Sequence, residues 1–223
     1  MLKLYSTDWS PWVRKVRIAA IERGIQDKIK LIPAIIGFAE KTLKTVKSDL
    51  TKFNPSGRVP TLITEQGKAI YDSTVIIHYL DSIGSVEPII SKDLDKRIKG
   101  LKLNALVDEV IDSLRHLSLE NRREQNIRLP DWIDALDKKV RRGIEVIEDD
   151  LKYLSNSNTN ILDLADISVV ILLGTIKRNP QSLYNIFSKD LNSWFNNMMD
   201  RKSIYDTNPP NLSIKYFKKF QYF

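Results

Sequence analysis

The sequence predicts an α/β half over residues 1–83 and an all-α half over residues 93–223. In the first half, short segments that alternate apolar and polar residues, as strands do, are interleaved with segments of helical period. From residue 84 onward only helical periods recur. The intervening stretch, 84–92, begins with Gly84-Ser85-Val86-Glu87-Pro88 and has the composition of a linker.

The first half opens with a strand, a loop and a helix. Residues 1–5 alternate as a strand does, and Ser10-Pro11 combines a preferred N-cap residue with a proline at the first helical position. Gly24 is in the usual position for a residue that ends a helix. The expected apolar face comprises Trp12, Val13, Val16, Ala19 and Ala20, with Arg14, Lys15, Arg17 and Arg23 largely on other faces.

The remaining elements of the first half follow in the order strand, irregular stretch, two strands and helix. We expect strands at 28–32, 59–64 and 69–71, a short helix around 40–50, a turn at 54–57, a hairpin loop at 65–68 and a helix that begins at Asp72-Ser73. Its expected buried residues are Val75, Ile76, Tyr79, Leu80 and Ile83. The order βαβ, then ββα, predicts a sheet of about four strands.

The second half reads as a series of helices. They are expected at about 93–117, 131–153, 167–175 and 189–199, and the first has Leu94, Ile98, Leu101, Ala105 and 108–111 at helical spacing. Asp163 is a good N-cap, and Asp166 is three residues on, where its side chain can complete a capping box. Leu162 and Ile167 are spaced as a hydrophobic staple around this cap.

Composition excludes several classes of protein. Hydrophobic residues make up 42% of the chain and charged residues 28%, values typical of a soluble globular protein. No apolar run approaches the roughly 18 residues of a membrane span, and no signal-peptide segment is recognisable, so we expect a cytoplasmic protein with no membrane partner. The chain has no cysteine and only His78 and His116, which argues against a thiol nucleophile and against a metal site.

The net charge of +7 is spread along the chain. Residues 1–83 carry 13 Lys/Arg against 8 Asp/Glu, and residues 84–223 carry 22 against 20. Acidic residues are interspersed with basic ones throughout. This pattern favours a small anionic ligand over a nucleic acid.

Three motifs carry a resemblance to a known family: Ser10-Pro11-Trp12-Val13-Arg14-Lys15-Val16-Arg17, Asn54-Pro55-Ser56-Gly57-Arg58-Val59-Pro60, and Tyr71-Asp72-Ser73-Thr74-Val75-Ile76. In this order, followed by a helical half, they resemble the cytosolic glutathione transferases, most closely the bacterial serine-type members. The resemblance implies a thioredoxin-like domain over 1–83 that binds glutathione, a linker over 84–92, an all-helical domain over 93–223, and a homodimer.

The resemblance also implies a glutathione site. Pro60 would be the cis proline of the thioredoxin fold, leaving the backbone of Val59 to pair with the cysteinyl unit of glutathione. Asp72 and Ser73 would bind the γ-glutamyl ammonium and carboxylate at a helix N-terminus, and Arg58 would contact the glycyl carboxylate or the peptide backbone. Many family members have Glu where this chain has Asp72, so the shorter side chain here would weaken or reposition the ammonium contact.

Ser10 would then donate a hydrogen bond to the glutathione sulfur, although capping alone also explains a serine at this position. Tyr5 is the rival hydroxyl, because some family members use a tyrosine near the end of the first strand. Thr7 is a weaker third candidate. Candidates for a second-substrate pocket are Trp9, Trp12, Arg115 and His116. The predicted function is conjugation of glutathione, as cosubstrate, to small hydrophobic electrophiles, or glutathione-dependent reduction of peroxides. The alternative is a non-catalytic binding or protein-interaction module.

Overall fold

The computed structural model describes residues 1–34, 49–155, 161–178, 184 and 187–209. These residues group into two compact units. The first comprises residues 1–91 together with 202–209, and the second comprises residues 92–201. Residues 202–209, which the sequence analysis assigns to the helical domain, therefore group with the first unit.

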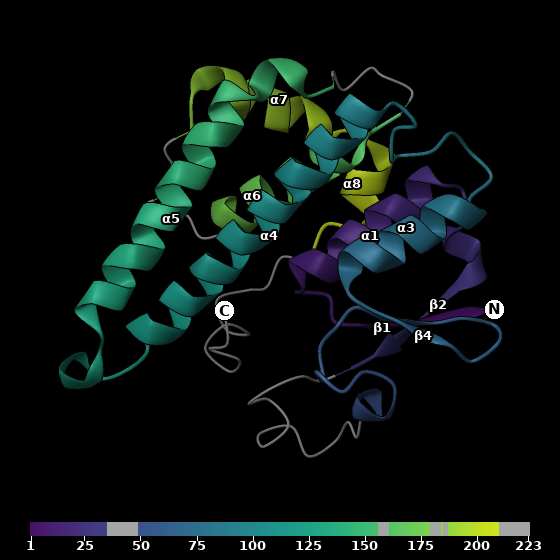
Figure 1. Cartoon of the computed structure of the whole chain (residues 1–223), viewed down its shortest axis with the longest axis horizontal. Helices are drawn as coiled ribbons and strands as arrows, with labels where there is room; N and C mark the ends of the chain where they lie inside the picture. The colour runs from purple at the N-terminus through teal and green to yellow at the C-terminus, as the bar shows by residue number, and fades with distance from the viewer. Residues whose placement is uncertain (35–48, 156–160, 179–183, 185–186, 210–223) are drawn as a thin grey trace. The chain divides into compact units, whose positions relative to one another are not determined.

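A four-stranded sheet forms the centre of the first unit (Figure 1). Its strands are β1 (Leu2–Ser6), β2 (Ile29–Pro33), β3 (Thr61–Ile63) and β4 (Ala69–Ile70), in the order β2-β1-β3-β4. Strand β2 runs parallel to β1, and β3 runs antiparallel to both β1 and β4. The number of strands agrees with the prediction of about four, although β3 begins at Thr61 rather than at Val59.

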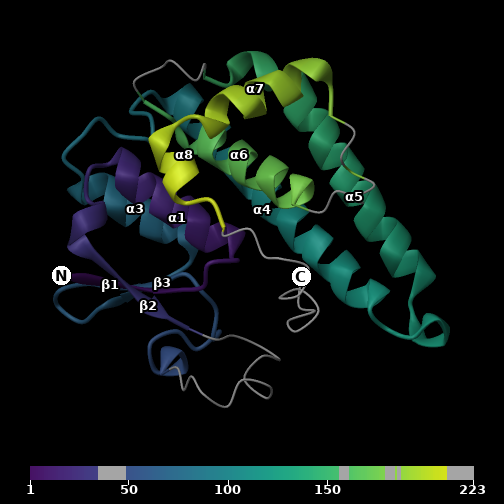
Figure 2. The same ribbon diagram turned by 180° about the vertical axis from the view of Figure 1, so that it is seen from behind.

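Two helices, α1 (Pro11–Glu22) and α3 (Ser73–Ile83), lie side by side on one face of this sheet (Figures 1 and 2). Helix α1 ends as the sequence predicts, with Gly24 at a φ of +64°. The N–H of Gly24 donates to Ile21 C=O at 2.9 Å, and the N–H of Ile25 donates to Ala20 C=O at 3.0 Å. These two bonds are the Schellman motif, which satisfies carbonyls at the end of a helix.

The expected polar face of α1 is wrong for three of its cations. Arg14, Lys15 and Arg23 are 5%, 0% and 4% exposed, because other elements cover that side of the helix. Helix α8 (Lys202–Asp206) packs on α1, and the Arg14 guanidinium donates to Ile204 C=O at 3.1 Å. Arg23 pairs with Asp81 of α3, with 3.0 Å between Nε and Oδ1.

The expected buried face of α3 is also partly wrong. Ile76, Ile77 and Leu80 are fully buried, whereas Val75 is 51% exposed and Ile83 39% exposed. Helix α3 packs on α1 and β3, so only the side that faces them is covered. Most of the predicted helix around 40–50 falls outside the described residues, and residues 50–52 form a short 3-10 turn.

The second unit contains α4 (Leu94–Asn121), α5 (Pro130–Asp149), α6 (Leu164–Lys177) and α7 (Lys189–Met199), and no strand among its described residues. Helix α4 packs against both α5 and α6 (Figure 2). The first part of its predicted apolar stripe is exposed, with Leu94 at 59% and Ile98 at 55%, whereas Val110 and Ile111 in the last part are buried. The buried residues of α4 are Gly100, Leu103, Asn104, Val107, Val110, Ile111, Ser113, Leu117 and Glu120.

The predicted capping box begins α6. The N–H of Asp166 donates to Asp163 Oδ1 at 2.9 Å, and the N–H of Asp163 donates to Asp166 Oδ2 at 3.0 Å. Asp166 Oδ1 accepts a third bond, from the N–H of Ser155 at 2.8 Å. Leu162 and Ile167, the expected staple, are both fully buried.

Candidate functional site

Ser10 caps the N-terminus of α1. Its backbone is extended, with φ −73° and ψ 120°, and its Oγ accepts a hydrogen bond from the N–H of Val13 at 3.2 Å. The side chain is 7% exposed. Within the described residues the hydroxyl donates to no acceptor, so its proton is available at the positive end of a helix dipole.

Val59 and Pro60 form a cis peptide bond, as the sequence predicts for Pro60. The Val59 side chain is 6% exposed, but its backbone N–H and C=O make no hydrogen bond to another described residue. An N–H and a C=O without partners can pair with an extended peptide, as the edge of a sheet does. The neighbouring Arg58 is exposed.

Asp72 is the N-cap of α3, and the Tyr71–Asp72 peptide bond is also cis. Oδ1 of Asp72 accepts from the N–H groups of Thr74 at 2.9 Å and Val75 at 3.3 Å. Its Oδ2 is in no hydrogen bond with the residues that the structure describes. The N–H of Ser73 likewise has no acceptor among these residues, so α3 presents one carboxylate oxygen and one amide donor.

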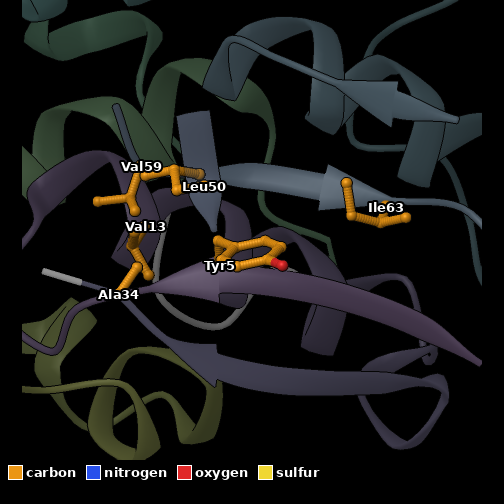
Figure 3. Close-up of a cluster of buried hydrophobic side chains, with 6 residues drawn as sticks. All are labelled: Tyr5, Val13, Ala34, Leu50, Val59 and Ile63. Atoms are coloured by element: carbon orange, nitrogen blue, oxygen red, sulfur yellow. The ribbon is translucent and has the colours of Figure 1, made fainter. Parts of the chain in front are cut away.

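An apolar cluster connects the segments that carry these groups (Figure 3). Its buried members are Tyr5, Val13, Ala34, Leu50, Val59 and Ile63. Val13 donates to Ser10 through its backbone, and Val59 carries the unpaired backbone groups before the cis proline. Packing of these two side chains in one cluster therefore ties the α1 N-terminus to the cis-proline loop.

The hydroxyl of Tyr5 lies in the same unit but is already engaged. It donates to Asp49 Oδ1 at 2.6 Å. Burial raises the pKa of Tyr5 to about 12, and the hydrogen bond to the Asp49 carboxylate adds to this effect. A phenol whose one O–H already donates a hydrogen bond to a carboxylate has no second O–H to donate to a sulfur. Thr7 is half-buried, and its Oγ1 accepts from the N–H of Trp9 at 3.3 Å.

The four residues predicted to line a second-substrate pocket fall in different units. Trp9 and Trp12 are half-buried in the first unit. In the second unit, Arg115 pairs with Asp112 at 3.4 Å and the ring of His116 contacts Trp132, with 6.3 Å between centroids. A shared pocket stays a prediction. The groove that the structure does describe on α4 is lined by Leu94, Asp95, Ile98, Lys99, Lys102 and Asp150.

The described residues contain neither a metal site nor a membrane-spanning helix. That part of the chain has no group of three or more His, Asp or Glu side chains placed to hold a metal ion. It also has no helix with the length and apolar character needed to cross a bilayer.

Sequence reasoning missed two residues that shape this site. Asp49 accepts the Tyr5 hydroxyl, and Asn54 makes four side-chain hydrogen bonds in the cis-proline loop. The sequence analysis places Asn54 in a turn and in a family motif but assigns its side chain no role, and its place six residues before Pro60 is the available signal. Nothing in the local sequence marks Asp49, because its partner is 44 residues away.

Comparison with known proteins identifies the family. Residues 9–83 match the family model of the glutathione S-transferase N-terminal domain. The GST-like protein YibF of Escherichia coli (strain K12) is 26% identical over 212 residues, which span 94% of this chain and 99% of YibF.

Two bacterial crystal structures extend the likeness over nearly the whole chain. A glutathione transferase family member from Pseudomonas fluorescens Pf-5, solved with bound glutathione, has a TM-score of 0.83 at 29% identity and covers 94% of this chain and 100% of its own. A glutathione S-transferase from Methylobacillus flagellatus KT, solved with glutathione bound, has a TM-score of 0.78 at 30% identity with the same coverage. These matches confirm the predicted fold class, a thioredoxin-like α/β domain followed by helices, and the chain belongs to the glutathione transferase superfamily.

Proposed function

We propose that this protein binds glutathione, stabilises its thiolate through the Ser10 hydroxyl, and transfers it to small hydrophobic electrophiles. One observation carries the proposal. Ser10 Oγ caps α1 as an acceptor while its proton has no acceptor among the described residues, so the hydroxyl can donate to a sulfur without giving up the cap. The glutathione bound to the relatives from Pseudomonas and Methylobacillus supports the choice of ligand.

Glutathione would be held along its length by backbone and side-chain groups of the first unit. The N–H and C=O of Val59 would pair with the cysteinyl unit as an added strand does. The free Oδ2 of Asp72 would accept from the γ-glutamyl ammonium, and the N–H of Ser73 would donate to the γ-glutamyl carboxylate. Arg58 is exposed and would reach the glycyl carboxylate.

The chemical step would proceed on the bound thiolate. A free thiol has a pKa of about 8.5, and lowering it by about two units takes about 2.7 kcal/mol of differential stabilisation. A hydrogen bond to a charged acceptor contributes about 1.5–3 kcal/mol, and the α1 N-terminus adds to it. The thiol proton leaves to solvent, and a sulfur electron pair forms a bond to the electrophilic carbon. In a substitution, the electron pair of the bond that breaks departs with the leaving group. In an addition, the π electron pair of an activated double bond moves away from the carbon that sulfur attacks.

The test compares wild type with Ser10→Ala. We expect both proteins to bind glutathione, but only wild type to lower the pKa of its thiol. The ultraviolet absorbance of the bound thiolate, followed as a function of pH, measures this pKa. Ser10→Thr keeps the hydroxyl and the cap and serves as the matched control. If wild type binds glutathione with an unshifted thiol, the serine mechanism is wrong. If it binds none, the non-catalytic module becomes the better account.

A homodimer is the second part of the proposal. Large apolar side chains are exposed on α3 and on α4, where Val75 is 51%, Leu94 59% and Ile98 55% exposed. Leu94 and Ile98 are one helical turn apart on α4 and form a contiguous apolar surface, and contiguous apolar surfaces are the kind that another chain covers. Analytical ultracentrifugation of wild type and Ile98→Glu tests this. A dimer that the charge dissociates is the expected result, and a monomeric wild type contradicts it.

A further inference from the structure

Asn54 is a buried amide at the start of the loop that leads into β3, and it uses both ends of its side chain. Its exposed fraction is 2%. Oδ1 accepts from the N–H of Ser56 at 3.0 Å and from the Ser56 hydroxyl at 2.7 Å. Nδ2 donates to Arg58 C=O at 3.1 Å and to Thr61 Oγ1 at 2.9 Å. Only an amide can accept on one side and donate on the other in this way.

The carbonyl of Arg58 is held from two directions. The Thr61 hydroxyl, which accepts from Asn54, itself donates to Arg58 C=O at 2.9 Å. Thr61 is fully buried, and its bond with Asn54 is buried, whereas the two bonds to Arg58 C=O are part-buried. Asn54 and Thr61 thus form a closed triangle with this one carbonyl.

This carbonyl fixes the direction of the N–H that follows it. Arg58 C=O and Val59 N–H belong to one peptide unit, which is planar, so a carbonyl held in place also holds the N–H on its opposite side. The Val59 side chain is buried in the apolar cluster of Figure 3, which leaves little freedom at the next Cα. The Val59 N–H itself has no acceptor among the described residues.

We propose that Asn54 is a positioning residue for glutathione: it aims the Val59 N–H at the ligand without touching the ligand. This inference rests on the proposed function, because it takes Val59 as the group that pairs with the cysteinyl unit. Asn54→Asp would keep the bonds from Ser56 but set a carboxylate oxygen against Arg58 C=O, where an N–H now donates. The carbonyl would turn away, and Val59 N–H with it.

The experiment measures glutathione affinity by titration calorimetry in Asn54→Asp and Thr61→Val, with Thr61→Ser as the matched control that keeps the hydroxyl. We expect glutathione affinity to be about tenfold weaker in Asn54→Asp and in Thr61→Val, because each of these two variants loses hydrogen bonds that hold Arg58 C=O. Thr61→Ser, which keeps the hydroxyl, should bind with an affinity near that of wild type. The thiol pKa of bound glutathione should stay at the wild-type value in all three, because Ser10 lies on a different element. A loss of stability alone would not weaken glutathione affinity while leaving the thiol pKa of the bound glutathione unchanged.

Two further measurements separate the possible failures. Asn104→Ala removes a buried amide of the second unit that accepts from the Ser168 hydroxyl, and it should lower the melting temperature without changing glutathione affinity.

Nuclear spin relaxation of the Val59 amide without ligand should report greater motion in Asn54→Asp and Thr61→Val only. If wild type binds no glutathione, the proposed function fails, and this relaxation still decides whether Asn54 holds the loop. Wild-type affinity or wild-type relaxation in Asn54→Asp overturns the inference.

Discussion

At the scale of the residue, the hydroxyls of Ser10 and Tyr5 differ in their hydrogen bonds. Ser10 keeps its proton because it caps α1 with its oxygen, whereas Tyr5 gives its proton to Asp49 at 2.6 Å. The two side chains therefore differ in what they can offer a sulfur, although both lie in the first unit. The fully buried carboxylate of Asp166 is likewise engaged: it accepts backbone N–H bonds from Ser155 and Asp163, and the N–H of Asp166 donates to the Asp163 carboxylate.

Tyr5→Phe tests the assignment of the activating hydroxyl. We expect the thiol pKa of bound glutathione to match wild type, because the proton of Tyr5 is already donated to Asp49. Removing the donor should lower the free energy of unfolding by about 1 kcal/mol. Thiolate absorbance and urea denaturation measure the two effects. A raised thiol pKa in Tyr5→Phe, with no effect of Ser10→Ala, would transfer the role from Ser10 to Tyr5.

Asp166 makes the stability of the second unit depend on pH. Burial, and then the Asp163 carboxylate, raise the pKa of Asp166 from 3.8 to about 6. The folded state therefore holds this proton more tightly than the unfolded chain does. Its contribution to the free energy of unfolding is fully present below pH 3.8 and is lost as the pH rises to about 6.

Asp163→Asn should reduce this loss. Asparagine is an equally good N-cap acceptor, but it removes the charge that raises the pKa of Asp166. We expect the variant to gain stability relative to wild type between pH 4 and pH 6, by less than about 1.4 kcal/mol per pH unit. Urea denaturation at a series of pH values measures this, with Asp93→Asn, at the exposed cap of α4, as the control. Parallel curves for wild type and Asp163→Asn would contradict the prediction.

Helix packing in the second unit depends on how closely the helix backbones approach, which is a property of the element. Gly143 of α5 faces Val110 of α4, and a Cβ at position 143 would lie 2.3 Å from Val110 Cγ2. Gly100 of α4 is looser, since a Cβ there would lie 4.0 Å from the backbone nitrogen of Ala165 in α6. Two glycines in helix interiors thus have different reasons to be there.

The matched pair Gly143→Ala and Gly100→Ala distinguishes these reasons. Alanine favours a helix over glycine by about 1 kcal/mol at either position. At 143 the added methyl meets the stiff β-branched Val110, so we expect a net loss of about 1–2 kcal/mol. At 100 the methyl makes an ordinary contact, so we expect no loss or a gain of up to about 1 kcal/mol. Equal effects in thermal denaturation would show that the α4–α5 approach is not this close.

The whole molecule is not divided at one point of the chain. After the helices of the second unit, α8 joins the first unit and packs on α1. Ile204 and Thr207 are 0% and 1% exposed, and the Ser203 hydroxyl donates to Glu22. The helix that carries Ser10 is therefore completed by a segment almost 200 residues further along the chain.

Truncation tests whether α8 stabilises the first unit. Chains 1–201 and 1–209 both lack residues 210–223, so the difference between them reports residues 202–209 alone. We expect the shorter chain to lose about 2–4 kcal/mol, as when large buried side chains are removed, and to show faster hydrogen exchange in α1. Urea denaturation and exchange mass spectrometry measure the two effects. Equal unfolding midpoints and equal exchange would mean that α8 contributes nothing.

Local signals were the part of this fold that could be predicted. The Ser10 and Asp72 caps, the left-handed Gly24 and the Asp163–Asp166 capping box involve partners within a few residues, so short motifs specify them. The alternating and helical periods gave the order of strands and helices for the same reason. The cis bond at Pro60 was predicted from the family resemblance and is present.

The tertiary structure alone decided which faces are covered and which hydroxyl is engaged. Arg14, Lys15 and Arg23 look like solvated charges along α1, but α3 and α8 bury that side of the helix. Leu94 and Ile98 have core spacing and remain exposed. Such outcomes depend on contacts between residues far apart in the chain, and a periodic pattern does not name its partner. The sequence by itself thus determined the elements and the family, and long-range packing determined which helix faces are buried and the hydrogen bond of Tyr5 to Asp49.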